Sequence, residues 1–124
     1  MNNNYDIDVH IITYNEPKWK IDRCLESLKN EPINIHIVDG FCEWPPNRIN
    51  AFSKGKAPFI SYVDPDDYVE SGCFSEKVPF LTEDFKCIYS YEYQHFPTRT
   101  DIGKSMHHAF ILPRGLFSDD VFSN

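Results

Sequence analysis

The sequence predicts an α/β domain built on a mostly parallel sheet. Two runs rich in β-branched residues, Ile7 to Tyr14 and Ile33 to Asp39, enclose a stretch of helical periodicity from Pro17 to Lys29. A strand, a helix and a second strand in immediate succession form a right-handed crossover with parallel strands. A third apolar run, Phe59 to Val63, ends in a group of acidic residues. The 124 residues suffice for one domain with a single core.

In the first half of the chain, turn residues mark where the predicted strands and helix begin and end. Asn15-Glu16-Pro17 is a turn after the first strand, and Pro17 suits the first turn of a helix, where its missing N–H costs nothing. Asn30-Glu31-Pro32 then ends the helix before the second strand. The apolar residues predicted on one side of this helix are Trp19, Ile21, Cys24, Leu25 and Leu28.

The second half of the chain predicts further elements of the same kind. A loop from 41 to 46 leads into a short helix from Asn47 to Lys54, which Gly55 ends. After the third strand, Ser71 could cap a helix that Pro79 would kink or end early. Two more strands are expected at 86–93 and 108–112, with a mobile loop over 96–106 between them.

Composition and charge restrict the class of protein. A hydrophobic content of 41% with 15% aromatic residues indicates a globular chain, and the net charge of −7 disfavours a polyanionic partner unless a basic patch attracts it. The four cysteines show no zinc spacing and are expected to be free, mostly buried thiols. Without a basic leader or an apolar run of membrane length, we expect a cytoplasmic protein without a membrane segment.

Three carboxylates stand where the third strand ends. Asp64, Asp66 and Asp67 fall within four residues, and acids this close repel one another unless a cation lies among them. Hard oxygen ligands suit Mg²⁺ or Mn²⁺, although the same residues could also form an acidic turn. Ligands of parallel sheets bind beyond the carboxyl ends of the strands, so 13–15 and Asp39 are expected beside this cluster.

The pattern resembles the nucleotide-sugar-binding half of family 2 glycosyltransferases with the GT-A fold. The residues that carry the resemblance occur in family order over roughly the first 80 positions: Thr13-Tyr14-Asn15, Asp39, Asn47-Arg48, Lys54-Gly55 and Asp64-Pro65-Asp66-Asp67. The resemblance implies a three-layer α/β/α sandwich with a mostly parallel sheet. It also implies transfer of a sugar from a nucleotide diphosphate donor, commonly a UDP-sugar, with Mn²⁺ or Mg²⁺ as cofactor.

The resemblance assigns roles to individual residues. It places the nucleotide against Thr13, Tyr14, Asn15, Asp39, Arg48 and Asp64, with Asp39 accepting a hydrogen bond from the base. Asp66 would be the main metal ligand, assisted by Asp64 and by a histidine, His107 or His108, before the last strand. Asp67 would support the loop. Each of these residues also has a structural interpretation, as a core, turn or surface residue.

An inverting transferase needs a carboxylate that accepts the proton of the attacking hydroxyl, and Asp119 or Asp120 is the candidate. An acidic tail is the competing interpretation of these two residues. The acceptor could be a saccharide, a protein or a modified nucleobase, and the protein could be a homo-oligomer. A nucleotide-sugar-binding module without transfer activity is the alternative function, and a nucleotidyltransferase is a third hypothesis, weakened by the missing Gly-rich phosphate loop.

Overall fold

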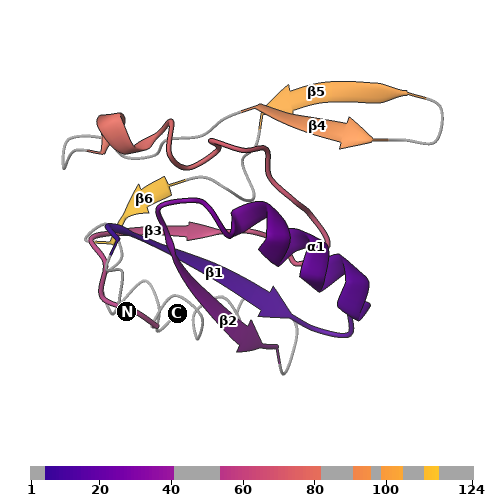
Figure 1. Ribbon diagram of the computed structural model, residues 1–124, viewed down its shortest axis with the longest axis horizontal. Helices are drawn as coiled ribbons and strands as arrows, with labels where there is room; N and C mark the ends of the chain where they lie inside the picture. The colour runs from indigo at the N-terminus through magenta and orange to yellow at the C-terminus, as the bar shows by residue number, and fades with distance from the viewer. Residues whose placement is uncertain (1–4, 41–53, 82–90, 96–98, 105–110, 115–124) are drawn as a thin grey trace, which may run out of the picture.

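The computed structural model describes residues 5–40, 54–81, 91–95, 99–104 and 111–114. Within these ranges the chain forms a four-stranded sheet, an α-helix, a short 3₁₀ turn and a separate two-stranded hairpin (Figure 1). The elements in chain order are β1 (Ile7–Thr13), α1 (Lys18–Leu28), β2 (Asn34–Asp39), β3 (Phe59–Tyr62), η1 (Val78–Phe80), β4 (Tyr91–His95), β5 (Thr100–Lys104) and β6 (Ile111–Pro113).

The sheet has the strand order β2-β1-β3-β6 and is parallel at two of its three pairings. β1 runs parallel to β2, with Thr13 opposite Asp39, and parallel to β3, with His10 opposite Tyr62. β6 is antiparallel to β3. The predicted parallel strand–helix–strand unit is therefore confirmed, and the carboxyl ends of β1, β2 and β3 lie at one edge of the sheet.

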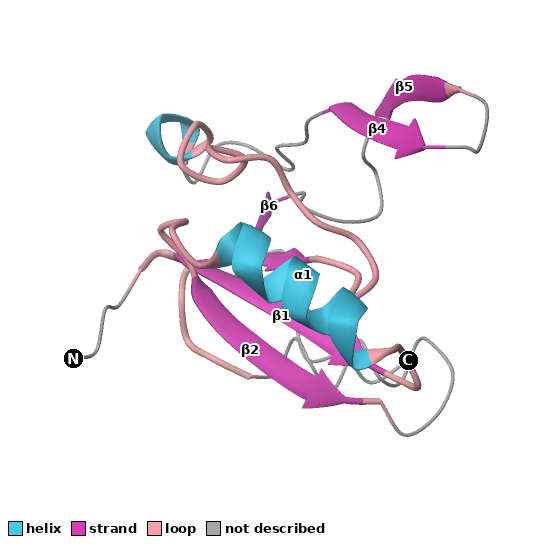
Figure 2. Ribbon diagram, turned by 45° about the vertical axis from the view of Figure 1, so that its right-hand side comes forward, coloured by secondary structure: helices cyan, strands magenta, loops and turns pink. Residues whose placement is uncertain are grey.

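α1 covers one face of this sheet (Figure 2). Pro17 is its N-cap residue, and Cys24 and Leu28 are fully buried in a core cluster with Ile7 and Val9 of β1. Trp19 does not join this face, contrary to the sequence prediction, and 59% of its surface is exposed. Trp19 lies five positions before Cys24, and this spacing turns its side chain away from the face that Cys24 buries.

The opposite face of β1 buries a carboxylate. Asp8 accepts hydrogen bonds from His36 Nε2 at 2.9 Å, Asn34 Nδ2 at 3.1 Å, the Ala57 amide at 2.9 Å and Arg114 Nη2 at 2.6 Å. Burial by itself would raise the pKa of Asp8, but the hydrogen bonds from His36, Ala57 and Asn34 outweigh it and lower the pKa. This one side chain ties β1 to β2, to the segment before β3 and to the end of β6.

His10 lies fully buried next to Asp8 on the same face of β1. Its Nδ1 is 3.1 Å from the Ser61 carbonyl oxygen and its Nε2 is 3.0 Å from that of Lys54, while its ring stacks on His36 with centroids 5.2 Å apart. A neutral imidazole has one N–H and can donate to one of these carbonyls at a time. Burial lowers the pKa of His10, although both carbonyl oxygens act to raise it.

Two sequence predictions are wrong. Residues 71–77 form successive turns, followed by η1 at Val78–Phe80, where a helix from Ser71 was expected. Gly72 has a φ of +91°, which an α-helix does not allow, and Pro79 cannot donate a helical hydrogen bond. The region expected to be a mobile loop contains β5, which pairs in antiparallel fashion with β4.

The remaining predictions agree with the structure only in part. β4 overlaps the end of the strand expected at 86–93, and β6 begins at Ile111, near the end of the strand expected at 108–112. The short helix predicted at 47–54 falls almost wholly outside the described residues. The second helical layer of a three-layer sandwich therefore stays a prediction, and the described fold is a mixed sheet covered by one helix.

Candidate functional site

The carboxyl ends of β1 and β2 bring two predicted nucleotide-binding residues into contact. Thr13 Oγ1 donates a hydrogen bond of 2.9 Å to Asp39 Oδ1, and the Gly40 amide donates one of 2.6 Å to the Thr13 carbonyl. Asn15, two residues farther along, has a φ of +66°, a left-handed conformation that asparagine tolerates better than most residues. Between them Tyr14 is 52% exposed, so its ring is open to a ligand rather than part of the core.

The acidic cluster of Asp64, Asp66 and Asp67 lies where β3 ends. One carboxylate oxygen from each residue lies within 4.8 Å of the other two, which is close enough for all three to share a metal ion. Tyr62, the last residue of β3, donates its hydroxyl proton to Asp64 Oδ1. Asp66 is exposed, while Asp64 and Asp67 are half-buried. The predicted convergence of these three acids is thus present in the structure.

α1 holds the loop that carries these acids. Cys24 donates its S–H to the Asp64 carbonyl at 3.7 Å, and Arg23 Nη2 donates to the Asp66 carbonyl at 3.0 Å. Ser27 Oγ accepts a hydrogen bond of 3.1 Å from the Val69 amide. Burial, reinforced by the nearby carboxylates, raises the pKa of Cys24 to about 12, so its thiol stays protonated and able to donate.

Glu31, just beyond α1, anchors the chain that follows this loop. Its carboxylate is buried and accepts hydrogen bonds from the amides of Gly72 at 3.2 Å, Phe74 at 2.7 Å and Ser75 at 3.4 Å. Three amide donors replace the water that the carboxylate loses on burial. Phe74 is thereby fixed in the core against α1 and β1.

The contacts of these supporting residues do not follow from the sequence alone. The sequence pattern assigns no role to Arg23 and predicts Glu31 only as part of the turn that ends the helix. A signal was present, because Arg23, Ser27 and Glu31 recur every four residues, directly before or near the buried positions Cys24 and Leu28. This spacing places Arg23 and Ser27 beside the buried row of α1, but it does not predict which backbone atoms they contact.

Several predicted site residues lie outside the described part of the chain. They are Arg48, His107, His108, Asp119 and Asp120. Their roles therefore stay predictions. The structure brings together Thr13 with Asp39 and Asp64 with Asp66 and Asp67, and it places both groups at the same edge of the sheet.

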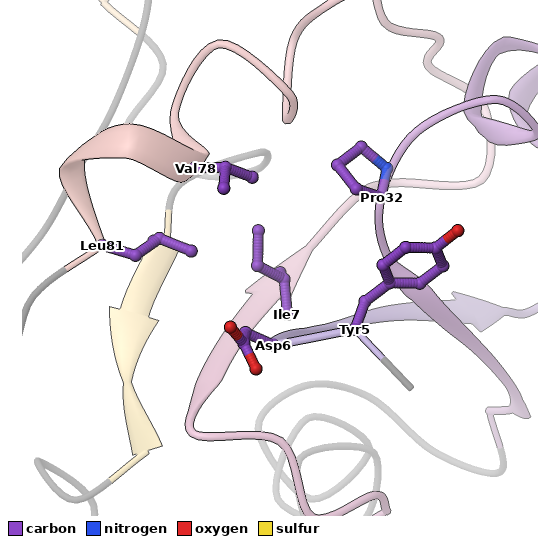
Figure 3. A pocket seen from close by; sticks show the side chains of 6 residues that line it. All are labelled: Tyr5, Asp6, Ile7, Pro32, Val78 and Leu81. Atoms are coloured by element: carbon purple, nitrogen blue, oxygen red, sulfur yellow. The ribbon is translucent and has the colours of Figure 1, made fainter. Parts of the chain in front are cut away.

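A cavity of about 140 Å³ opens at the other end of β1. Val78 and Leu81 face it from one side and Tyr5 and Pro32 from the other, with Ile7 at its centre (Figure 3). Its lining contains none of the predicted site residues. The predicted site residues that the structure describes lie at the carboxyl edge and not in this cavity.

Comparison with known proteins finds a match among solved structures. The crystal structure of S. aureus TarS 1-349, a glycosyltransferase, is similar to this chain with a TM-score of 0.59 and 13% sequence identity. The chain has a glycosyltransferase-like α/β fold. No protein-family model and no curated protein matches the sequence.

The structural similarity covers 93% of this chain and 49% of the TarS chain in that crystal structure, so this chain spans about half of the TarS chain. At this identity the likeness concerns the fold and not the substrate. Among the described residues, no helix combines the length and hydrophobicity that a membrane crossing requires.

Proposed function

We propose that this protein is a metal-dependent, inverting glycosyltransferase that uses a nucleotide diphosphate sugar, of which a UDP-sugar is the first candidate. The observation that supports it best is the cluster of three carboxylates at the carboxyl edge of a glycosyltransferase-like sheet. In α/β sheets this edge is where ligands bind.

The acidic cluster fits a divalent cation. Asp64, Asp66 and Asp67 offer only carboxylate oxygens, the donor type that Mg²⁺ and Mn²⁺ prefer, and their ligand atoms lie within 4.8 Å of one another. When bound there, the metal would neutralise the charge that develops on a departing diphosphate. Asp66 is the main proposed ligand and Asp64 the second, with His108 as a further candidate.

The residues of this chain would contribute binding and orientation. Asp39, held by Thr13, would accept a hydrogen bond from the nucleobase, while Tyr14 and Asn15 would line the nucleotide. Arg48 is proposed to face the donor. The acceptor hydroxyl must lose a proton as it attacks the anomeric carbon from the side opposite the diphosphate, and Asp119 or Asp120 is the proposed base.

The decisive experiment compares nucleotide binding with and without metal. In a thermal-shift screen with Mn²⁺, UDP should raise the melting temperature of the protein, since a ligand that binds only the native state stabilises it. Asp66→Asn should abolish the Mn²⁺-dependent part of this shift and leave the melting temperature of the free protein unchanged. Asp22→Asn is the matched control, because Asp22 is an exposed acid of α1 paired with Lys18. An undiminished UDP shift in Asp66→Asn would exclude the proposed metal site.

A second candidate function is nucleotide-sugar binding without transfer, by one part of a larger assembly. It rests on the same residues, because the bonded pair of Thr13 and Asp39 and the three carboxylates would bind a donor whether or not the sugar is transferred. Incubation with UDP-sugars, Mn²⁺ and a panel of acceptors separates the two functions. Donor binding with neither transfer nor hydrolysis supports the binding module, and a glycosylated acceptor supports the transferase.

A further inference from the structure

Arg23 makes three contacts where α1 meets the acidic loop. Its guanidinium carbon is 4.5 Å from the ring centroid of Tyr68 and 5.1 Å from that of Trp19, and its Nη2 donates to the Asp66 carbonyl at 3.0 Å. Trp19 belongs to α1, whereas Asp66 and Tyr68 belong to the loop after β3. The arginine therefore spans the junction between the helix and the loop, near three carboxylates.

The helix side of this junction is the rigid one. Cys24 and Leu28 fix α1 to the sheet in the core, so an arginine that follows the first turn of α1 projects from a firmly held element. The loop side is more open, because Asp66 and Tyr68 are both exposed. Cys24 and Ser27 hold the loop at Asp64 and Val69, toward its two ends. Arg23 contacts the stretch between these two attachments.

We infer that Arg23 is a positioning residue for the proposed metal site, an inference that rests on the proposed function. It fixes the main chain at Asp66 and the ring of Tyr68, the residues on either side of Asp67. The carboxylates of Asp66 and Asp67 are thereby held in a shared arrangement before a cation binds. Pre-arranged ligands bind metal more tightly, because less ordering remains to be done on binding.

A lysine side chain cannot reproduce the contacts that Arg23 makes. A guanidinium is planar and can stack on aromatic rings while its N–H groups donate in fixed directions, whereas an ammonium is a compact charge on a flexible stem. Arg23→Lys therefore keeps the positive charge and removes the geometry. Arg23→Gln removes the charge, which otherwise repels an incoming cation. A positioning role predicts weaker metal binding in both variants, whereas an effect of charge alone predicts tighter binding in Arg23→Gln.

The test is a Mn²⁺ titration of the full chain, followed by the electron paramagnetic resonance signal of free Mn²⁺. Arg23→Lys should weaken Mn²⁺ binding by about tenfold or more, the usual effect of removing a residue that orients metal ligands. Lys20→Gln is the matched control, because Lys20 also lies on α1 near the Trp19 ring, with Nζ 5.6 Å from its centroid. We expect unchanged Mn²⁺ affinity in this control. Wild-type affinity in Arg23→Lys, or tighter binding in Arg23→Gln, would overturn the inference.

Amide hydrogen exchange without metal provides the second readout. The Asp67 amide donates to the Asp64 carbonyl at 3.0 Å and the Val69 amide to Ser27, and both should exchange faster in Arg23→Lys. Amides of β1 should keep their protection. If the wild-type protein binds no Mn²⁺ but these two amides lose protection, the metal site fails and the positioning contact stands. If Mn²⁺ binds and exchange is unaltered in the variant, the metal site stands and the positioning role is refuted.

Discussion

The hydroxyl of Thr13 and the carboxylate of Asp39 are joined by a hydrogen bond of 2.9 Å across the ends of β1 and β2. The two residues also occupy opposite positions in the strand register. Asp39 is exposed, and within the part of the chain that the structure describes this bond holds its carboxylate. The orientation of the proposed base-binding group therefore depends on the residue that ends the neighbouring strand.

Thr13→Val should weaken UDP binding by about fivefold, the equivalent of one hydrogen bond of about 1 kcal/mol. Thr13→Ser keeps the hydroxyl and should bind UDP like the wild type. Calorimetric titration with UDP in the presence of Mn²⁺ measures both affinities. Equal affinity in the valine and serine variants would show that Thr13 does not orient Asp39 for the nucleotide.

Glu31→Gln should destabilise the protein by about 1–3 kcal/mol, because a buried amide accepts fewer hydrogen bonds than a carboxylate and adds two donors that need partners. Because the backbone amides of Gly72, Phe74 and Ser75 all donate hydrogen bonds to Glu31, the loss of stability should exceed that for an exposed acid. Urea unfolding measures this change in the free energy of unfolding. Glu26→Gln is the control, since Glu26 is an exposed acid of α1 paired with Lys29, and it should change stability little.

Gly55 and Gly72 form a matched pair for substitution by alanine. Both have positive φ, +87° and +91°, so each Ala variant bears about 1–2 kcal/mol of left-handed strain. A Cβ on Gly55 would also stand 2.2 Å from Asp8 Oδ2, whose position is fixed by its hydrogen bonds, whereas one on Gly72 would meet Glu76 Oε1 at 3.2 Å. Glu76 is exposed and its side chain can move away.

Gly55→Ala should therefore lower the free energy of unfolding clearly more than Gly72→Ala does. Urea or thermal unfolding of the two variants under the same conditions provides the comparison. Equal losses would mean that the Asp8 carboxylate is not held as closely against Gly55 as the structure indicates.

Stability should fall in two steps on acidification. The pKa of His10 lies below its ordinary value of 6.5, so below that pH the unfolded chain takes up a proton that the folded chain refuses, and stability decreases. The pKa of Asp8 is also lowered, so a second decrease follows below about pH 4, where the unfolded carboxyl protonates first. The contributions of both groups are fully present above pH 6.5 and diminish as the pH falls.

Urea unfolding from pH 7.5 down to pH 3.5 tests this dependence. His10→Gln should flatten the first decrease and leave the second. Stability that rises on acidification from neutral pH to about pH 5.5 would contradict a lowered pKa for His10.

The sequence predicted the elements whose signals are local. Apolar runs gave β1, β2 and β3 to within one residue at each end, and Pro17 marked the start of α1. Because β1 is parallel to its neighbours, the side chains that end these strands had to share one edge, and Thr13, Asp39 and the acidic cluster were found there. The helix expected from Ser71 does not form because Gly72 has a φ of +91°, and amides of this segment donate instead to Glu31, about forty residues earlier in the chain.

What the sequence by itself determined is the alternation of strand and helix, and with it the edge at which chemistry can occur, because periodicity and turn residues act over a few neighbouring positions. Tertiary structure alone decided that Arg23 contacts the acidic loop, that Asp8 and His10 are buried among polar partners, and that β5 pairs with β4. These contacts join distant parts of the chain or depend on which strands become neighbours. Their energies depend on the burial and direction of each group, which exist only once the sheet has assembled.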